Sequence, residues 1–405
     1  MPVTRSSDRA RTTPRDRGVS VNTAAHGQRR VTLQTIADAL SVSRTTVSNA
    51  YSRPDQLNPR LRQRILEVAR QLGYAGPHPA ARSLRSGRAD AVGVLLTEML
   101  SYAFTDPAAV RFLEGMAQAG EQAGVGLLLV PPLPASSEAA AVREAVVDGF
   151  VVYSMPDAHP AVLAVLERRQ PTVVVDQPRI QGVPFVGIDD RLAARQAAEH
   201  LLALGHERFG VVCFRLSLDD YSGPVNAARL AGATFRLTRD RLAGYADALR
   251  AAGLNFRKVP IEERPLNSAA AGADAAAALL DRRHPPTAIL STSDQLAIGL
   301  LEETRRRGIA VPGELSVVGF DDIEPTATAT PPLTTVRQSL LEKGRVAGRL
   351  ILEQEAPPRG DTLLLPTELV VRASTAPARA ARRSLGVPGP GRPAAIARGA
   401  VLPGR

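Results

Sequence analysis

The 405-residue sequence is poor in cysteine and in aromatic residues. It has one cysteine, Cys213, which excludes a disulfide framework and a thiolate metal cage. Tryptophan is absent and aromatic residues make up 4% of the chain, which argues against a platform for stacking the bases of a single strand. No apolar run approaches the roughly 18 residues of a membrane span, and residues 1–30 lack the apolar core of a secretory signal. The composition predicts a soluble cytoplasmic protein.

Signatures of catalysis are also missing from the sequence. It contains no G-x-S-x-G, no H-E-x-x-H and no P-loop, and its six histidines form no cluster typical of metal ligands. Carboxylates are abundant, but none form a pair that can be placed beside a substrate. We therefore expect no catalytic residue, no metal and no cofactor.

Positive charge is present in excess, and it is unevenly distributed. Residues 1–30 and 31–90 each carry a net charge of +5, and residues 376–405 carry +6. Because the whole chain carries +10, residues 91–375 carry −6. A GC-rich genome can account for the choice of Arg over Lys, but not for this segregation by sign. A basic head on an acidic body predicts that the head binds a polyanion such as nucleic acid.

Residues 31–76 have the pattern of three short helices. Thr32 is expected to cap the first helix, Ser43 the second, and Asn58 the third, where proline follows at the first helical position. Apolar residues recur at i, i+3 and i+4 in the first and third helices, which gives them a common core. Three helices with a short turn predict a helix-turn-helix headpiece whose second helix enters the major groove.

The second helix has a polar outer face. Arginine can bind guanine through two hydrogen bonds, asparagine can bind adenine, and hydroxyl groups suit phosphate oxygens. The alternative is a solvated polar face with no ligand. With the capping residues and one arginine of the third helix included, the expected DNA contacts are Thr32, Ser43, Arg44, Thr45, Thr46, Ser48, Asn49, Asn58 and Arg62.

A basic linker follows over residues 77–90. It contains a short helical stretch, Ala80–Arg85, in which Leu84 stands next to arginine. A leucine in such a linker suits an apolar wedge that enters a minor groove and bends the duplex, with Ala81 on the same stretch. The alternative is a hinge leucine that packs on its own domain.

Residues 91–375 alternate short apolar runs with Ala-rich amphipathic segments. Near-continuous apolar strands separated by helices predict parallel sheets covered on both faces, and the length predicts two α/β lobes. A ligand is expected in the cleft at the carboxyl ends of the strands. Residues 1–30 and 376–405 are expected to be disordered basic tails. The expected strands are Ala91–Leu96, Gly126–Val130, Phe150–Tyr153, Thr172–Asp176, Phe185–Ile188, Phe209–Cys213, Ala288–Ser291 and Ser316–Phe320.

A series of short motifs runs in a fixed order through the head, the linker and the body. In the head and linker they are Val31-Thr32-Leu33, Ala37, Val42-Ser43, Thr46-Val47-Ser48, Gly73-Tyr74, Ala81-Arg82-Ser83-Leu84 and Gly87, and in the body Asp189-Asp190-Arg191, Arg241-Leu242-Ala243-Gly244-Tyr245, Ser293-Asp294-Gln295 and Ser316–Asp322. In this order and spacing the chain resembles LacI/GalR-family transcriptional regulators, and the resemblance continues through residue 372, so it covers everything but the tails. It implies a headpiece, a hinge helix that orders on operator DNA, and a two-lobed effector domain like a periplasmic sugar-binding protein.

The resemblance also implies roles for single residues. Arg44, Thr45 and Asn49 match base-reading positions, and Leu84 matches the leucine that intercalates at the operator centre. Asn49 replaces the more usual Arg, and the family's hinge asparagine is missing, so operator bases cannot be copied from a relative. Matching the effector contacts of relatives are Tyr102, Phe104, Asp176, Arg241, Asn267 and Asp294.

Alternatives remain for several of these body residues. Asp294 can cap the helix that follows it, Asp176 can cap a loop, and the two aromatic residues can be ordinary packing. His206 is expected to be structural. The segment Arg215–Arg239 is longer than usual in the family and is either a lid or a surface elaboration.

The sequence predicts a homodimeric transcriptional regulator, a repressor, in the bacterial cytoplasm and associated with the nucleoid. Its partners are double-stranded, pseudo-palindromic operator DNA and a small-molecule effector, a sugar or related metabolite. One rival interpretation is a small-molecule-binding protein with a vestigial head. The other is a sugar-processing α/β enzyme, which would turn its ligand over.

Overall fold

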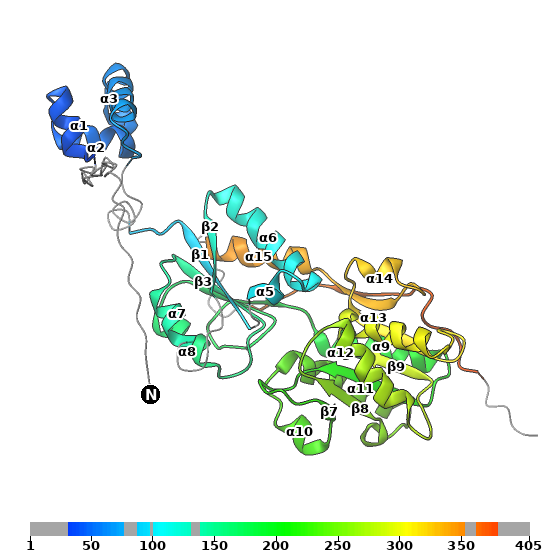
Figure 1. Ribbon diagram of the computed structural model, residues 1–405. Helices are drawn as coiled ribbons and strands as arrows, with labels where there is room; N and C mark the ends of the chain where they lie inside the picture. Colours follow the sequence, from blue (N-terminus) through cyan, green and yellow to red (C-terminus); the bar gives the residue numbers. More distant parts are fainter. Residues whose placement is uncertain (1–30, 77–86, 98–99, 131–137, 353–361, 380–405) are drawn as a thin grey trace, which may run out of the picture. The chain divides into compact units, whose positions relative to one another are not determined.

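The computed structural model describes residues 31–76, 87–97, 100–130, 138–352 and 362–379 (Figure 1). The chain divides into two compact units, residues 1–87 and 88–405. This division falls within the predicted linker 77–90. The expected minor-groove residues Ala81 and Leu84 lie outside the described residues, as do the predicted arm 1–30 and residues 380–405 of the predicted tail.

The first unit contains the three predicted helices. They are α1 (Leu33–Leu40), α2 (Arg44–Ser52) and α3 (Pro59–Gln71), with a 3₁₀ turn, η1 (Pro54–Gln56), between the last two. Small side chains let α1 and α2 approach closely, and α3 packs across both. The core consists of Ile36, Ala37, Val47, Ala50, Ile65 and Ala69, all of them buried.

Each helix of the first unit begins at its predicted cap. The hydroxyl of Thr32 accepts a hydrogen bond from the Thr35 backbone N–H at 3.3 Å. The hydroxyl of Ser43 accepts one from the Thr46 N–H at 2.9 Å, and the amide oxygen of Asn58 accepts one from the Arg60 N–H at 2.9 Å. These bonds satisfy N–H groups that the first turn of a helix leaves without intrahelical partners.

The first lobe of the second unit is built on a parallel sheet. Its strand order is β12-β5-β4-β3-β1-β2, and each pair of neighbouring strands is parallel. The strands are β1 (Ala91–Leu96), β2 (Gly126–Val130), β3 (Gly149–Tyr153), β4 (Thr172–Val175), β5 (Phe185–Gly187) and β12 (Thr362–Leu364). The helices of this lobe are α5 (Leu100–Ala103), α6 (Pro107–Ala123), α7 (Glu138–Glu144), α8 (Pro160–Glu167) and α15 (Leu340–Leu352).

The second lobe has a seven-stranded sheet in the order β13-β11-β10-β9-β6-β8-β7. The edge strands β7 and β13 run antiparallel to their neighbours, and the other pairs are parallel. Its strands are β6 (Phe209–Phe214), β7 (Gly223–Pro224), β8 (Ile261–Arg264), β9 (Ala288–Ser291), β10 (Ser316–Asp321), β11 (Thr334–Gln338) and β13 (Thr367–Val370). Its helices are α9 (Asp190–Ala203), α10 (Ala227–Ala231), α11 (Arg236–Ala251), η2 (Phe256–Lys258), α12 (Ala269–Leu280), α13 (Asp294–Arg306) and α14 (Pro325–Thr328).

The chain passes between the two lobes three times, after β5, after β11 and after β12. The predicted two-lobed α/β architecture is therefore confirmed, and all eight predicted strands are present. Cys213 is fully buried in the core of the second lobe. No helix within the described ranges is long and apolar enough to cross a lipid bilayer.

One helix pair of the first lobe approaches unusually closely. Helices α6 and α15 meet at Gly115 and Gly344, where the two backbones are in contact. A Cβ atom added at Gly344 would lie 2.1 Å from the Phe112 carbonyl oxygen. Glycine is therefore required here by the approach of one backbone to the other.

The predicted tail begins later than expected. The backbone N–H of Ala378 donates a hydrogen bond to the Leu204 carbonyl at 2.8 Å, and that of Ala376 donates one to the Ser316 hydroxyl at 3.1 Å. His206 also binds the Ala376 carbonyl. The first residues of the expected tail are thus part of the second lobe.

Candidate functional site

The outer face of α2 carries the side chains expected to contact DNA bases. Arg44 and Thr45 are exposed, and Asn49 is half-buried on the same helix. The predicted positions Thr46 and Ser48 are also half-buried, and the Thr46 hydroxyl lies 2.8 Å from that of Ser43. The face is polar and begins at the amino end of the helix, which is the end that reads bases in a helix-turn-helix.

The other predicted DNA contacts have structural partners in the first unit. Thr32, Ser43 and Asn58 are helix caps, as described above. The Arg62 guanidinium donates from Nε to the Ala50 carbonyl at 3.2 Å, so it ties α3 to the last turns of α2. These residues support the orientation of α2, and their exposure leaves them accessible to phosphate oxygens.

In the second unit, a cavity lies at the carboxyl ends of the strands of both lobes. Its volume is about 90 Å³, below the range of roughly 300–1,000 Å³ that is usual for ligand cavities. An effector of sugar size must therefore part the lobes or displace side chains. The polar residues that line the cavity are Thr97, Tyr102, Asp106, Tyr153, Ser154, Asp176, Arg215, Arg241, Asn267, Asp321 and Gln338.

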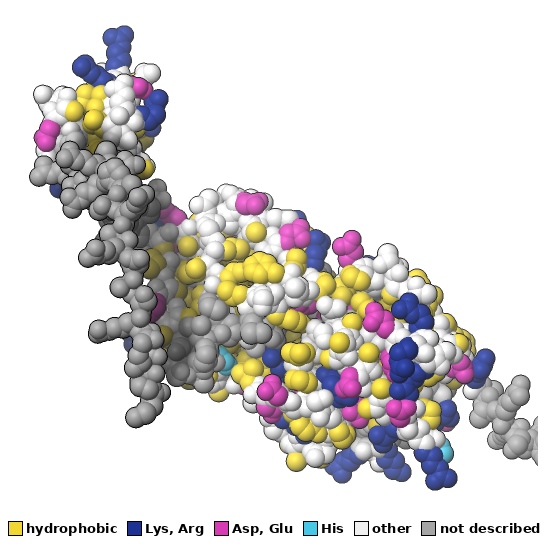
Figure 2. Space-filling view, viewed as in Figure 1, with side chains coloured by type: hydrophobic (Ala, Val, Ile, Leu, Met, Phe, Trp, Pro, Cys, Tyr) yellow, Lys and Arg dark blue, Asp and Glu magenta, His cyan; other side chains and the backbone are white. Residues whose placement is uncertain are grey.

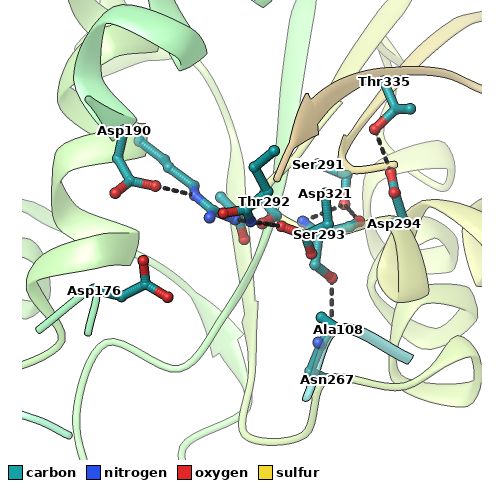
Figure 3. Close-up of polar contacts among 12 residues, drawn as sticks. Ala108, Asp176, Asp190, Asn267, Ser291, Thr292, Ser293, Asp294, Asp321 and Thr335 are labelled. Carbon is teal, nitrogen blue, oxygen red and sulfur yellow. Dashed lines mark hydrogen bonds and ion pairs between the residues drawn. The ribbon is translucent and has the colours of Figure 1, made fainter. Parts of the chain in front are cut away.

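A continuous series of polar side chains joins the lobes beside this cavity. We call it the inter-lobe polar chain, and its members are Asp176, Lys343, Gln338, Asp321, Arg241 and Asp190 (Figure 3 labels its three aspartates). Asp176 follows β4 of the first lobe, and Lys343 lies on α15 of the same lobe. The other four members belong to the second lobe, so the link between the lobes runs from Lys343 to Gln338.

The contacts within the inter-lobe polar chain are short. Lys343 Nζ forms an ion pair with Asp176 Oδ1 at 2.5 Å and also donates to Gln338 Oε1. Gln338 Nε2 donates to Asp321 Oδ1 at 2.5 Å. The Arg241 guanidinium contacts Asp321 at 3.4 Å and Asp190 at 2.9 Å.

Charge in this chain is not balanced. Two buried cations, on Lys343 and Arg241, face three buried carboxyl groups, on Asp176, Asp190 and Asp321. Burial raises the pKa of Asp321 to about 8, although Arg241 opposes the shift. Burial disfavours charge on Arg241 as well, but the carboxylates of Asp190 and Asp321 outweigh this effect and raise the pKa of its guanidinium. Burial therefore favours the protonated form of Asp321, a form that can donate as well as accept a hydrogen bond.

Several residues at the strand ends have unusual backbone conformations. The φ angles of Ser154, Asp176 and Asp321 are 55°, 64° and 117°, in the region that favours glycine. Each follows or ends a parallel strand and lines the cavity. Positive φ at non-glycine residues costs about 1–3 kcal/mol and is often retained at ligand sites, where it orients a side chain.

The structure brings together four of the six predicted effector residues. Asp176, Arg241, Tyr102 and Asn267 line the cavity. Tyr102 comes from the first lobe, and its hydroxyl donates to the Asn267 carbonyl of the second lobe at 2.8 Å. Tyr102 lies on the short helix α5.

The other two predicted effector residues do not line this cavity. Phe104 is 64% exposed and does not line the cavity, because α5 directs Tyr102 inward instead. Asp294 is fully buried behind the cavity wall, where it accepts hydrogen bonds from the Thr335 hydroxyl at 2.6 Å and the Ile323 N–H at 3.0 Å (Figure 3). Its carboxylate holds β11 and the segment after β10 in place.

The carboxylate that faces the cavity beside Arg241 is Asp321, which the sequence analysis did not select as a candidate. The sequence did contain an indication, because Asp321 directly follows the predicted strand Ser316–Phe320, much as Asp176 ends the predicted strand Thr172–Asp176. Gln338 ends β11 in the same way, whereas Lys343 is a helical residue for which the sequence offered no such indication.

Two further expectations concern the second lobe. His206 is buried, and its ring nitrogens hydrogen-bond to Thr287, Ser316 and the Ala376 carbonyl, in agreement with a structural role. The insertion Arg215–Arg239 begins and ends at the cavity, which Arg215 and Phe235 line. Its middle part adds β7 to the edge of the sheet and α10 beside it, so the segment combines a cavity wall with a sheet edge.

Comparisons with known proteins agree with the two-lobed fold of the second unit and with the helical first unit. Residues 198–375 match the model of the periplasmic binding protein-like domain family. The HTH-type transcriptional regulator Rv3575c of Mycobacterium tuberculosis is 45% identical over 350 residues, which is 85% of this chain and 96% of that protein.

Solved structures of transcriptional regulators are also similar to this chain over most of its length. A LacI-family transcriptional regulator from Corynebacterium glutamicum is 37% identical with a TM-score of 0.64, covering 86% of this chain and 98% of that one. The complex of the regulator CelR with cellobiose is 26% identical with a TM-score of 0.61, covering 85% of this chain and 100% of that one.

Proposed function

The chain belongs to the LacI family of transcriptional regulators, and on this premise we propose that it is a homodimeric repressor whose operator is pseudo-palindromic. It is a DNA-binding regulator controlled by an effector. Two headpieces would bind half-sites about one helical turn apart, with the second helix of each in the major groove. Leu84 and Ala81 would act at the operator centre, where an apolar wedge unstacks a base step.

The base contacts are assigned to the outer face of α2. Arg44 is exposed near the amino end of this helix and can bind guanine through two hydrogen bonds. Asn49 offers an amide that suits adenine, and Thr45, which lies between Arg44 and Asn49 in the sequence, offers a hydroxyl. The remaining predicted contacts, such as Ser43 and Arg62, would bind phosphate groups and set the orientation of the helix.

The effector is assigned to the cavity beside the inter-lobe polar chain, and its chemistry favours a sugar or a related polyhydroxylated metabolite. Carboxyl groups of Asp106, Asp176 and Asp321 face the cavity, and burial raises the pKa of Asp106 to about 6. Paired carboxyl and amide groups bind neighbouring hydroxyls, while the guanidinium of Arg241 can bind a ring or carbonyl oxygen.

The inter-lobe polar chain is the observation that carries the proposal. Ligand hydroxyls that bind Asp321 and Asp176 compete with Gln338 and Lys343 for the same oxygen atoms. Because Gln338 and Lys343 also form the hydrogen bond that joins the lobes, a ligand that takes their aspartate partners would alter that bond as well. Coupling between an effector and DNA in such a system amounts to about 1–3 kcal/mol.

Two assays with the purified full-length protein test this function. Selection from random duplexes is expected to yield a pseudo-palindromic motif. A thermal-shift screen of sugars is expected to raise the melting temperature of the wild-type protein, because a ligand that binds only the native state stabilises it. The Asp321→Ala variant should lose this shift while selecting the same DNA motif, whereas Asp220→Ala, an exposed carboxylate outside the cavity, should retain both.

Three outcomes would contradict the proposal. A sugar that binds without any selected duplex motif would point to a vestigial head. Turnover of that sugar would point to an enzyme. A normal ligand shift in Asp321→Ala would place the effector elsewhere.

A further inference from the structure

A second, larger cavity lies in the second lobe, at the opposite ends of the strands from the effector cavity. It has a volume of about 610 Å³, within the usual range for ligand cavities. The amino ends of three adjacent strands form its floor, since Phe209 begins β6, Pro260 precedes β8 and Pro286 precedes β9. It shares no lining residue with the effector cavity.

Cations surround this second cavity. Its rim carries Arg208, Lys258, Arg282 and Arg283, together with His284 and a single acidic residue, Glu207. Figure 2 shows Lys and Arg side chains gathered along the lower edge of this lobe. The rim is therefore strongly basic, although residues 91–375 as a whole carry a net charge of −6.

The cations of the rim differ from most other arginines of the second unit in forming no ion pair with a described residue. Within the described ranges, most arginines of this unit form ion pairs, such as Arg229 with Asp219 and Arg307 with Asp281. No ion pair in the part of the chain that the structure describes includes a cation of the rim, and the Nε of Arg208 instead donates to the Pro285 carbonyl at 3.3 Å. Concentrated positive charge of this kind attracts anions.

The walls of this cavity are apolar. Leu254 and Val259 are partly exposed, and the other apolar lining residues are Phe209, Leu249, Pro260 and Pro286. Phosphate groups alone would leave this surface uncovered. A ligand that fills the cavity needs an apolar or aromatic part as well as negative charge.

We propose that this basic cavity binds an organic phosphate of nucleotide size, with its flat apolar part against Leu254 and Val259 and its phosphates on Arg282, Arg283 and Lys258. Arginine forks bind phosphate oxygens in pairs, and lysine adds a point charge. A DNA duplex is a poor fit, because its convex backbone cannot enter a concave site and cover the apolar wall. This basic cavity is separate from the proposed effector cavity, and the proposal for it does not depend on which molecule the effector is.

The test uses the full-length protein and a fluorescent ATP analogue that carries its label on the ribose. Binding is followed by fluorescence anisotropy, with ATP and inorganic tripolyphosphate as competitors. The double variant Arg282→Glu/Arg283→Glu is expected to bind the analogue at least tenfold more weakly. The matched control, Arg169→Glu/Arg305→Glu, makes the same charge change at exposed arginines outside the cavity and is expected to bind as the wild type does.

The competitors and one further variant complete the test. ATP is expected to displace the analogue at lower concentration than tripolyphosphate, because only ATP covers the apolar wall. Asp321→Ala, in the effector cavity, is expected to leave binding unchanged, so the result is independent of the proposed effector site. The proposal is overturned by absence of binding, by equal weakening in the control double variant, by equal competition from both anions, or by loss of binding in Asp321→Ala.

Discussion

The buried ion pair between Lys343 and Asp176 offers a direct test of the inter-lobe polar chain. Lys343 is fully buried, and its Nζ lies 2.5 Å from Asp176 Oδ1. Replacing Lys343 by methionine keeps the length and volume of the side chain but removes the charge. The carboxylate of Asp176, 5% exposed, then loses its ion-pair partner in a site that water barely reaches.

The expected cost follows from that burial. Removing one partner of a buried ion pair costs about 3–5 kcal/mol, because the remaining charge is neither paired nor hydrated. In a unit of this size, 1 kcal/mol corresponds to about 2 °C in melting temperature. Lys343→Met should therefore lower the melting temperature of the second unit by about 6–10 °C. The chain's other lysine, Lys258, is exposed, and Lys258→Met should change the melting temperature by about 1 °C or less.

Differential scanning calorimetry of the full-length variants measures these shifts. The double variant Lys343→Met/Asp176→Asn removes both charges, and a neutral pair of similar volume is often as stable as the ion pair it replaces. The double variant should therefore recover at least half of the loss seen in Lys343→Met. If it melts as low as the single variant, the two residues are not energetically coupled and the reasoning fails.

Three further predictions concern other parts of the molecule. The pKa of Asp321 is about 8 in the folded protein and 3.8 ordinarily, so the stability that this group contributes is full below about pH 4 and is lost as the pH rises through 8. The melting temperature of the wild-type protein should therefore fall over this pH range, and Asp321→Asn, which cannot titrate, should reduce that fall. An unchanged slope would refute the assignment. Arg44→Ala should relax the preference at one base position of the selected operator by about 1–3 kcal/mol, and an identical motif would count against base reading by this residue. Gly344→Ala should lower the melting temperature through a clash equivalent to about 1–3 kcal/mol, whereas a rise would show that α6 and α15 can separate at little cost.

The headpiece could be predicted in detail because its signals are local. A cap acts on N–H groups two or three residues away, so Thr32, Ser43 and Asn58 could be identified from the sequence and confirmed by their hydrogen bonds. The buried parallel strands were equally clear, since a strand covered on both faces is a run of apolar residues. Ala91–Leu96 and Ala288–Ser291 were predicted with the bounds that the structure has.

Strand β8 could not be found in the same way. Its sequence is Ile-Glu-Glu-Arg, and charged residues normally indicate surface. In the structure all four residues are buried, because Glu263 accepts from Arg229 and Arg264 pairs with Glu262 and Asp274. Those partners include residues up to 34 positions away, so a pattern of neighbouring residues cannot reveal them.

The sequence analysis selected Asp294 rather than Asp321 for a similar reason. Both are buried aspartates at strand or helix ends, and both have a raised pKa because of burial, so residue type and position do not separate them. Their partners separate them. Asp294 is held by Thr335 and Ile323 behind the cavity wall, whereas Asp321 faces Arg241 and Gln338 at the cavity.

The polar character of the contact between the lobes has a consequence for control by an effector. An apolar contact would stabilise one arrangement of the lobes, and a hydroxylated ligand could not replace it without leaving polar groups unsatisfied. The hydrogen bond from Lys343 to Gln338, which joins the lobes, and the neighbouring bonds to Asp321 and Asp176 can instead be exchanged for bonds with ligand hydroxyls, one for one. The net change in free energy is then small, which places the two arrangements within the few kcal/mol that a ligand can shift. A buried polar chain is less stabilising than a well-packed apolar contact, and in this cleft its advantage is that a ligand can compete for it.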